Sequence, residues 1–204
     1  ITRQDRTRDY LEKTVQDIVD AICDTAEMIK REFPAVDIDL DRKVKFITTQ
    51  ELEDLYPDLT PKQRENAITK EYGTVFLMCI GDTLKSGIRH DGRAPDYDDW
   101  TLNGDILFWN DVMDSAFEVS SMGIRVDAKA MEEQLKKANC EYRKEMPFHK
   151  MLLNGELPLT IGGGIGQSRL CMLILQKAHI GQVQVSVWDE ETKKICSQNG
   201  ITLL

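Results

Sequence analysis

Apolar and charged residues alternate along the chain in patterns that predict its helices and strands. Over residues 9–33, apolar side chains recur at helical spacing with charged residues between them, and Pro34 ends the pattern. Such spacing lines up one apolar stripe, so it predicts a long amphipathic helix. The apolar positions of this helix are Leu11, Val15, Ile18, Ile22, Ile29 and Phe33.

Shorter patterns predict strands and further helices. A continuous apolar run over residues 74–80 has the length of a strand and is typical of the centre of a sheet. Thr60 and Pro61 suit the cap and first position of a helix that runs to Tyr72. The polar stretch 85–105, rich in Asp, Arg and Gly, is expected to be a loop. Further strands are predicted at 44–48, 105–109, 117–126 and 183–188, and further helices at 49–57, 127–138, 147–154 and 166–177.

The mixture of these elements predicts an α+β fold with a largely antiparallel sheet flanked by helices. The chain has 204 residues, 41% hydrophobic and 30% charged, which suits a single domain over residues 1–204. A net charge of −9 disfavours nonspecific binding to nucleic acid, and no apolar stretch has the length of a membrane span. The five cysteines include no C-x-x-C pair, so neither zinc nor a disulfide framework is indicated. We therefore expect a cytoplasmic protein that binds neither nucleic acid nor membrane.

The glycine-rich stretch from Ile161 to Leu170, IGGGIGQSRL, is the strongest candidate for a ligand site. Glycines let a backbone approach a flat or charged ligand because no Cβ stands in the way. The helix that follows directs unpaired N–H groups at that ligand, and Arg169 in its first turns is suited to stack on a base or pair with phosphate. The glycine order fits neither the dinucleotide fingerprint nor a Walker loop. The alternative is a helix packed closely on a strand through small residues.

Two carboxylates on neighbouring predicted strands are candidates for a magnesium site. Asp105 begins one strand and Glu118 lies in the next, and Mg²⁺ usually takes one or two protein carboxylates together with substrate phosphates. Ser120 and Ser121 keep the surface beside them small, and Arg125 adds a positive charge suited to a carboxylate or phosphate. The alternative is structural, with Asp105 capping a turn and Glu118 paired with Arg125.

The loop from Arg89 to Trp100 combines acids, arginines and aromatic residues. Such a mixture suits a ligand that carries both an ammonium group and a carboxylate, as an amino acid does. The alternative is a solvated surface. His90 is more often structural in such a loop, and His149 and His179 have no companions at metal-ligand spacing. No nucleophile motif occurs.

Together these segments resemble asparagine synthetase A, the ammonia-dependent aspartate ligase family, over nearly the whole chain. The segments that carry the resemblance are Tyr56-Pro57-Asp58-Leu59, Arg93-Ala94-Pro95-Asp96-Tyr97-Asp98-Asp99-Trp100, Leu102-Asn103-Gly104-Asp105-Ile106, Glu118 to Arg125, Gly162 to Leu170 and His179-Ile180-Gly181-Gln182-Val183-Gln184. The family's fold is similar to the catalytic core of class II aminoacyl-tRNA synthetases. The resemblance implies that aspartate, ATP and ammonia give asparagine, AMP and pyrophosphate through a β-aspartyl adenylate. It also implies Mg²⁺ and a homodimer.

The resemblance assigns expected roles to particular residues. Arg169 is expected against the adenine of ATP, and Asp105 and Glu118 are expected to face the ATP-bound Mg²⁺. Arg169, Asp98 and Arg93 are expected to be the catalytic residues, the last two beside the amino acid. The remaining nucleotide site is expected to involve Gly162, Gly163, Gly164 and Val119, and the remaining substrate site Arg125, Ser120, Ser121 and Met122.

The family pattern has two parts that this sequence lacks. One is a segment before the long helix that carries the first two class II motifs, and the other is a longer loop between Trp100 and Thr101. We expect both in the complete protein, and we expect the present chain alone to have no ligase activity. The alternatives are an aspartyl- or asparaginyl-tRNA synthetase-like core and a noncatalytic nucleotide-binding remnant.

Overall fold

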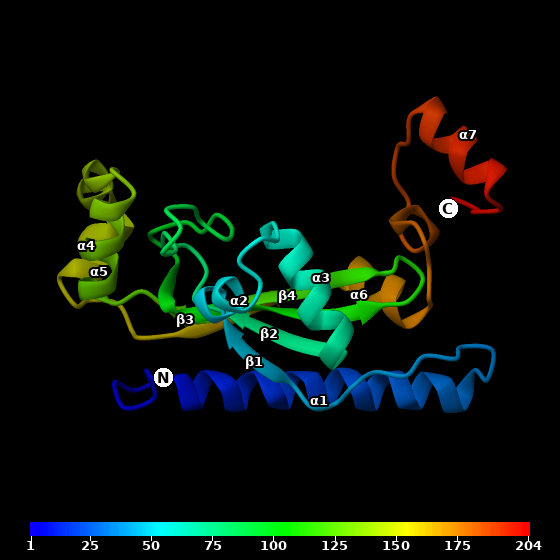
Figure 1. Cartoon of the computed structure of the whole chain (residues 1–204). Coiled ribbons are helices and arrows are strands. Elements are labelled where there is room, and N and C mark those ends of the chain that lie inside the picture. The colour runs from blue at the N-terminus through cyan, green and yellow to red at the C-terminus, as the bar shows by residue number, and fades with distance from the viewer.

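The computed structural model describes all residues 1–204 as a five-stranded sheet with one long helix beneath it and shorter helices above and at its ends (Figure 1). The strands are β1 (Lys45–Thr48), β2 (Thr74–Met78), β3 (Asp98–Asn110), β4 (Ser115–Arg125) and β5 (Ile161–Ile165). The helices are α1 (Arg8–Glu32), α2 (Thr49–Leu55), α3 (Pro61–Tyr72), α4 (Ala128–Lys137), α5 (Pro147–Leu153), α6 (Gln167–Ile174) and α7 (Glu190–Gln198). Two 3₁₀ turns span Glu141–Glu145 and Ile180–Gln182.

The strands lie in sequence order, β1-β2-β3-β4-β5. Only β1 and β2 run parallel, and they are connected through α2 and α3, as a parallel pair requires a crossover. The other three pairings are antiparallel. The prediction of an α+β fold with a largely antiparallel sheet is confirmed.

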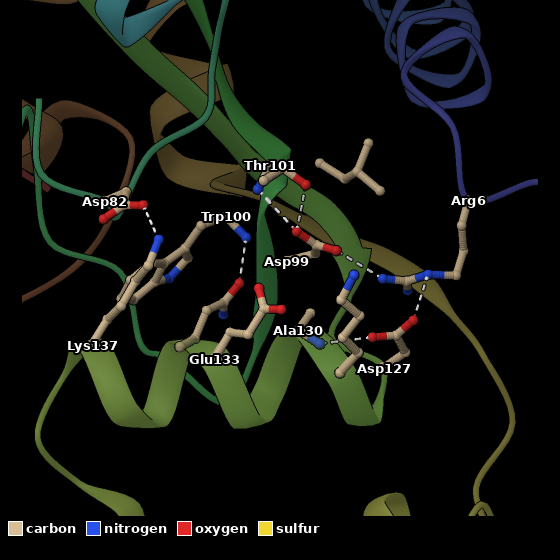
Figure 2. Close-up of a pocket in the computed structure, with 12 residues that line it drawn as sticks. Arg6, Asp82, Asp99, Trp100, Thr101, Asp127, Ala130, Glu133 and Lys137 are labelled. Atoms are coloured by element: carbon tan, nitrogen blue, oxygen red, sulfur yellow. Dashed lines mark hydrogen bonds and ion pairs between the residues drawn. The ribbon is translucent and has the colours of Figure 1, made fainter.

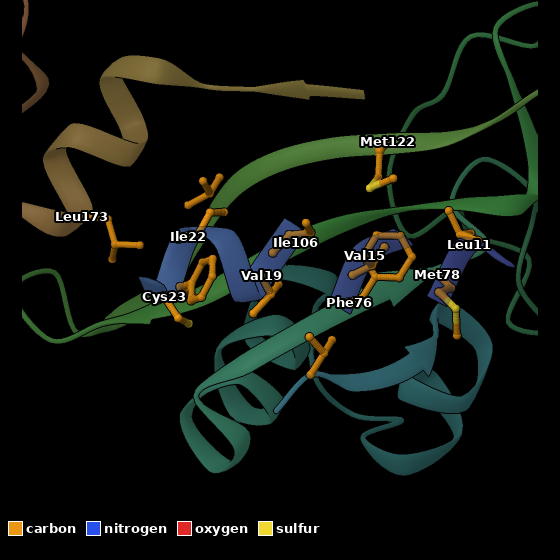
Figure 3. Packing of buried hydrophobic residues seen from close by; sticks show 13 residues of the cluster. Leu11, Val15, Val19, Ile22, Cys23, Phe76, Met78, Ile106, Met122 and Leu173 are labelled. Atoms are coloured by element: carbon orange, nitrogen blue, oxygen red, sulfur yellow. The ribbon is translucent and has the colours of Figure 1, made fainter. Parts of the chain in front are cut away.

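The long helix α1 buries its apolar stripe against one face of the sheet, here called the α1 face (Figure 3). The cluster between them contains Leu11, Val15, Val19, Ile22, Cys23, Val44, Phe76, Met78, Ile106, Phe108, Val119, Met122 and Leu173. Each such side chain contributes about 1.5–3 kcal/mol when fully buried, so this layer fixes which sides of β3 and β4 face inward.

A second cluster lies on the opposite face, under α2 and α3, and it ends before the last two strands. It contains Ile47, Leu52, Ile68, Val75, Leu77, Ile80 and Leu107. None of these residues comes from β4 or β5. That part of the face, here called the open face, is therefore not filled by the hydrophobic core.

Helix starts follow the local signals in the sequence. Thr7 accepts from the backbone of Tyr10 at the start of α1, and Thr60 forms a capping box ahead of Pro61. Asp127 caps α4 in the same way. The predicted helices therefore begin at, or within a residue of, their expected positions. None of the helices combines the length and apolar character that a membrane crossing requires.

Two predictions of secondary structure are wrong, and one helix was not predicted. Residues 183–188 are not a strand, because no other strand lies beside them, and Val187 is 98% exposed. The expected loop 85–105 ends early, because β3 already begins at Asp98, where it pairs with β4. The helix α7 follows an aspartate cap at Asp189 that the sequence analysis passed over. β3 runs through Trp100 and Thr101. The longer loop expected between these two residues in the complete protein stays a prediction.

Candidate active site

Strand register brings most of the predicted site residues to the open face. Asp105 pairs with Ser121, and Ser121 pairs with Gly164, so these positions on β3, β4 and β5 point to the same side. Arg125 lies on that side too, since a Cβ built on Gly162 would come within 2.7 Å of its Nη2 atom. The open face therefore carries acids, an arginine and a glycine strand side by side.

One end of this face is built around an ion pair between Asp98 and Arg125, which are also register partners. The guanidinium of Arg125 lies over the ring of Tyr97, 3.9 Å from its centroid, and its Nη2 donates to the Tyr97 hydroxyl at 3.0 Å. Burial raises the pKa of Asp98, while Arg125 acts in the opposite direction. A carboxylate and a guanidinium held this way offer partners for an ammonium group and for a carboxylate, so this is here called the amino-acid end.

The centre of the face is the ion pair between Arg93 and Asp105. Burial, helped by the negative charge of Glu118 and opposed by Arg93, raises the pKa of Asp105 to about 6. Arg93 also lowers the pKa of Asp98 through its charge, so it lies close to both aspartates.

The other end is formed by Glu118 and Arg169, and it is here called the nucleotide end because ATP is expected there from the sequence analysis. The Arg169 Nη1 atom donates to the Glu118 carbonyl at 3.2 Å and lies 3.5 Å from Glu118 Oε1. Both side chains are nearly half exposed, at 49% and 41%. The Cβ of a residue at Gly164 would meet no atom within 4 Å. On this face the backbone of β5 is therefore uncovered at Gly164, and the guanidinium of Arg169 is half-exposed.

The glycine stretch combines the two interpretations that the sequence left open. A Cβ on Gly163 would lie 2.5 Å from the Met122 Cβ, on the α1 face, so this glycine permits close packing. Gly162 and Gly164 point the other way, toward Arg125 and toward free space. Packing and ligand access thus belong to alternate residues of one strand.

Three predicted lining residues do not reach the open face. Val119 and Met122 are 2% exposed and belong to the cluster on the α1 face. Ser120 is equally buried and pairs with Ile106 of that cluster. The expectation that the Ser120 and Met122 side chains line the pocket is corrected, because strand alternation turns them inward and leaves Ser121 facing the site. The Val119 side chain, expected at the nucleotide site, turns inward because a bulge interrupts the alternation there.

A bulge in β4 decides where Glu118 points. Ile106 pairs with Ser120, but the next residue, Leu107, pairs with Glu118, so Val119 is an extra residue in the ladder. Three positions separate Glu118 from Ser121, so in a regular strand they would face opposite sides. The bulge restores Glu118 to the side of Asp105.

The structural alternatives for these charges are not found. Asp105 lies within β3 and pairs with Arg93, so it does not cap a turn. Arg125 pairs with Asp98 and not with Glu118. Two histidines serve structural pairs: Nε2 of His90 lies 3.0 Å from Glu65 Oε1, and Nε2 of His149 lies 2.9 Å from Asp96 Oδ2.

Among the described residues, no group of three or more His, Cys, Asp or Glu side chains is arranged to hold a metal ion by itself. Asp105 and Glu118 nevertheless fit Mg²⁺, which commonly binds one or two carboxylates and completes its shell with phosphates and water. Burial, and to a lesser degree the negative charge of Glu118, raises the pKa of Asp105, and a cation between the two carboxylates would favour the charged form of Asp105.

Comparison with known proteins identifies the family. A family model described as aspartate-ammonia ligase matches residues 1–200. The chain belongs to the aspartate–ammonia ligase family. Over its whole length it is 61% identical to the aspartate–ammonia ligase of Clostridium tetani and 57% identical to that of Levilactobacillus brevis. It covers 60% and 61% of those proteins, so the chain spans about three fifths of the length of these curated relatives.

Solved structures confirm the fold predicted for this ligase-family chain. The asparaginyl-tRNA synthetase of Entamoeba histolytica matches with a TM-score of 0.57 and 18% identity, over 85% of this chain and 44% of that chain. The asparaginyl-tRNA synthetase of Pyrococcus horikoshii matches with a TM-score of 0.56 and 17% identity, over 84% of this chain and 43% of that chain. Both belong to the predicted class II fold, and identities this low speak to the fold alone.

Sequence reasoning about this ligase-family chain missed the residues that hold the segments carrying Asp98 and Arg125 in place. Gln134 of α4 donates to the carbonyls of Pro95 and Asp98 and accepts from the backbone N–H of Trp100. Arg6 bonds to β3 and β4 on the same side, beside a polar hollow of about 370 Å³ (Figure 2). Both contacts join residues that are far apart in the sequence, so no local pattern indicates them.

Proposed function

We propose that the protein containing this chain synthesises asparagine from aspartate, ATP and ammonia, and releases AMP and pyrophosphate. The observation that carries the proposal is the order of groups along the open face. The amino-acid end, the Arg93–Asp105 pair and the nucleotide end follow one another along β3 and β4, with β5 beside them. Relatives named aspartate–ammonia ligase, 55–61% identical to this chain, support the same activity.

The substrate aspartate carries three charges that the amino-acid end and the centre can match. Arg125 would bind the α-carboxylate and Asp98 the ammonium group. The β-carboxylate would then extend toward Arg93, which lies near both Asp98 and Asp105. Arg93 is placed to stabilise negative charge on the β-carboxylate or the α-phosphate during the transfer.

The chemistry proceeds in two steps because a carboxylate is a poor electrophile. An oxygen of the β-carboxylate attacks the α-phosphorus of ATP, and the bond to the pyrophosphate leaving group breaks. Ammonia then attacks the acyl carbon of the mixed anhydride, AMP leaves with the bonding electrons, and the nitrogen loses a proton to form the amide. The protein's part is to align the two substrates and to offset the charge that develops between them.

ATP would occupy the nucleotide end. Adenine would lie on the β5 backbone at Gly164 and stack against Arg169, which is half-exposed and held at one nitrogen by Glu118. Asp105 and Glu118 would hold Mg²⁺, which offsets phosphate charge when bound. A solved neighbour of E. histolytica, an asparaginyl-tRNA synthetase, is in complex with asparaginyl-adenylate, and that likeness supports an adenylate on this fold.

A second candidate is a core that charges tRNA, because the solved neighbours are aspartyl- and asparaginyl-tRNA synthetases. The net charge of −9 argues against it, since tRNA binding needs a basic surface. We further propose that the protein is a cytoplasmic homodimer, in keeping with the class II resemblance.

The test is asparagine formation by the longest form of the protein that its gene encodes. Purified protein is incubated with aspartate, ATP, Mg²⁺ and ammonium, with and without tRNA, and asparagine, AMP and pyrophosphate are measured. We expect asparagine and AMP in equal amounts, without a requirement for tRNA. Arg125→Met should abolish the reaction, whereas Arg8→Met, an exposed arginine paired with Glu12, should not. Asparaginyl- or aspartyl-tRNA without free asparagine would overturn the proposal.

A further inference from the structure

We propose that Arg6, in the segment before α1, is a positioning residue that aligns the amino-acid end of the site. The proposal rests on the proposed function, because the effect it predicts is on aspartate. Arg6 touches none of the groups assigned to substrate. It acts through the backbone of Arg125 and through Asp99, the neighbour of Asp98.

The pairing of β3 with β4 is interrupted next to the amino-acid end. Asp98 pairs with Arg125, but the next paired residues are Asn103 and Gly123. Residues 99–102 of β3 therefore lie opposite a single residue of β4. The backbone N–H of Arg125 donates to the Thr160 carbonyl and not to β3. The backbone thus holds this pair on one side only, where the Val126 N–H donates to the Tyr97 carbonyl at 3.0 Å.

Arg6 bridges this interruption with all three of its guanidinium nitrogens. Figure 2 shows its contacts with Asp99 and Asp127. Its Nη1 donates to the Arg125 carbonyl at 2.6 Å and its Nη2 to Asp99 Oδ2 at 2.8 Å. Its Nε lies 3.4 Å from Asp127 Oδ2, beyond the end of β4. The Arg6 side chain is only 10% exposed, so these contacts are shielded from water. One planar group thereby ties the interrupted part of β3 to the end of β4.

Asp99 transmits this contact to the rest of the interrupted segment. Its second oxygen, Oδ1, accepts from the backbone N–H of Thr101 at 2.9 Å and from the Thr101 hydroxyl at 2.7 Å. The carboxylate is thus held on both sides, and the peptide between Asp98 and Asp99 is held with it. Because adjacent residues face opposite sides, Asp98 is left facing Arg125 on the open face.

The consequence is specific to aspartate. Binding is strongest when the groups that contact the substrate are already in place, and a small misplacement costs much of the rate. The nucleotide end lies seven positions along β4, from Arg125 to Glu118, which is roughly 20 Å at strand geometry. Loss of Arg6 should therefore weaken the use of aspartate and leave ATP binding nearly unchanged.

The experiment compares Arg6→Met, Arg6→Lys and the control Arg8→Met in the full-length protein. Initial rates of asparagine formation give KM for aspartate and for ATP, and thermal unfolding checks that each variant is folded at the assay temperature. We expect Arg6→Met to lower kcat/KM for aspartate by about ten- to a hundredfold, with the KM for ATP unchanged. Arg6→Lys keeps the charge but has one nitrogen in place of three, so it should recover only part of the loss. Arg8→Met should match the wild type.

Hydrogen exchange adds a readout that does not depend on turnover. Amides of residues 98–102 should exchange faster in Arg6→Met than in Arg8→Met, while those of β5 should not. Equal changes in the KM for aspartate and ATP, or a lower melting temperature with both KM values unchanged, would overturn the positioning role. Wild-type protein that makes no asparagine would refute the proposed function and this inference together. An active wild type with kinetically silent Arg6 variants would refute the inference alone.

Discussion

Two adjacent glycines of β5 offer a test of which side of the sheet receives the nucleotide. Gly164 points to the open face, where an added Cβ meets no atom within 4 Å. Gly163 points to the α1 face, where an added Cβ lies 2.5 Å from the Cβ of Met122. Neither glycine has a positive φ, so alanine strains the backbone at neither position. The two substitutions therefore differ only in what the new methyl group meets.

Gly164→Ala should impair ATP binding without impairing the fold. Alanine is about 0.5–1 kcal/mol more favourable than glycine within a strand, so the free energy of unfolding should stay equal or rise slightly. An adenine in contact with the β5 backbone has to move away from the new methyl group. Overpacking of that kind costs about 1–3 kcal/mol. Such a cost corresponds to roughly a 5- to 140-fold higher KM for ATP.

Gly163→Ala should do the reverse. The new methyl group overlaps Met122 and comes within 3.1 Å of the Ser121 carbonyl oxygen, so the α1 face must repack. Repacking costs about 1–3 kcal/mol of stability and leaves the open face as it was. The KM for ATP of the folded protein should therefore be close to the wild-type value.

The assay measures both quantities on the same full-length proteins. Rates of asparagine formation are followed against ATP at saturating aspartate and ammonium, and unfolding is followed in urea. The reasoning is refuted by Gly164→Ala with a wild-type KM for ATP. It is also refuted by Gly163→Ala with a raised KM for ATP and unchanged stability, because the nucleotide would then lie on the other face.

The remaining predictions concern the charged groups of the open face. Arg169→Met should raise the KM for ATP but change the free energy of unfolding by less than about 1 kcal/mol, because the pair that Arg169 forms with Glu118 is half-exposed. ATP titration and urea unfolding measure the two effects. A large loss of stability with ATP affinity retained would contradict the nucleotide role. Tyr97→Phe keeps the ring under Arg125 but loses the hydroxyl that accepts from it, so the KM for aspartate should rise about fivefold. Tyr97→Ala removes the ring as well and should raise this KM more. Equal KM values for aspartate in the two variants would contradict the role of the ring. Burial raises the pKa of Asp105 from its ordinary 3.8 to about 6, so between these values the folded protein binds the proton more tightly than the unfolded chain. The free energy of unfolding of the wild type should therefore fall relative to that of Asp105→Asn as the pH rises from 3.8 to about 6. Urea unfolding measures this difference at each pH, and a difference that does not change with pH would contradict the raised pKa of Asp105.

The parts of the fold that sequence predicts well are those fixed by short-range chemistry. Thr60 and Pro61 mark the start of α3 because the threonine side chain caps the helix and proline tolerates its first position. The error at residues 183–188 has the opposite origin. Val185 and Val187 alternate with polar residues as in a strand, but a strand needs a neighbour, and none lies there.

The residue types of the candidate site were predictable, but their orientation was not. Asp105 and Ser121 reach the open face by simple alternation, and the same alternation turns Met122 inward. Glu118 reaches the open face only because Val119 is bulged out of the ladder, and no signal in the single sequence marks that bulge. The side that a strand residue faces depends on its register with a partner, which local patterns do not contain.

Both irregularities of the β3–β4 ladder lie at an end of the candidate site, and each is supported by a distant part of the chain. At the nucleotide end, the carbonyl of the bulged Val119 accepts from the backbone N–H of Gly166 at 2.9 Å, just before α6. At the amino-acid end, Arg6 bridges the gap beside Arg125. A regular ladder would need neither contact, but it would turn Glu118 away from the open face. The segments before α1 and after β5 thus do more than cover the sheet: they maintain the two departures from regular pairing on which the arrangement of charges depends.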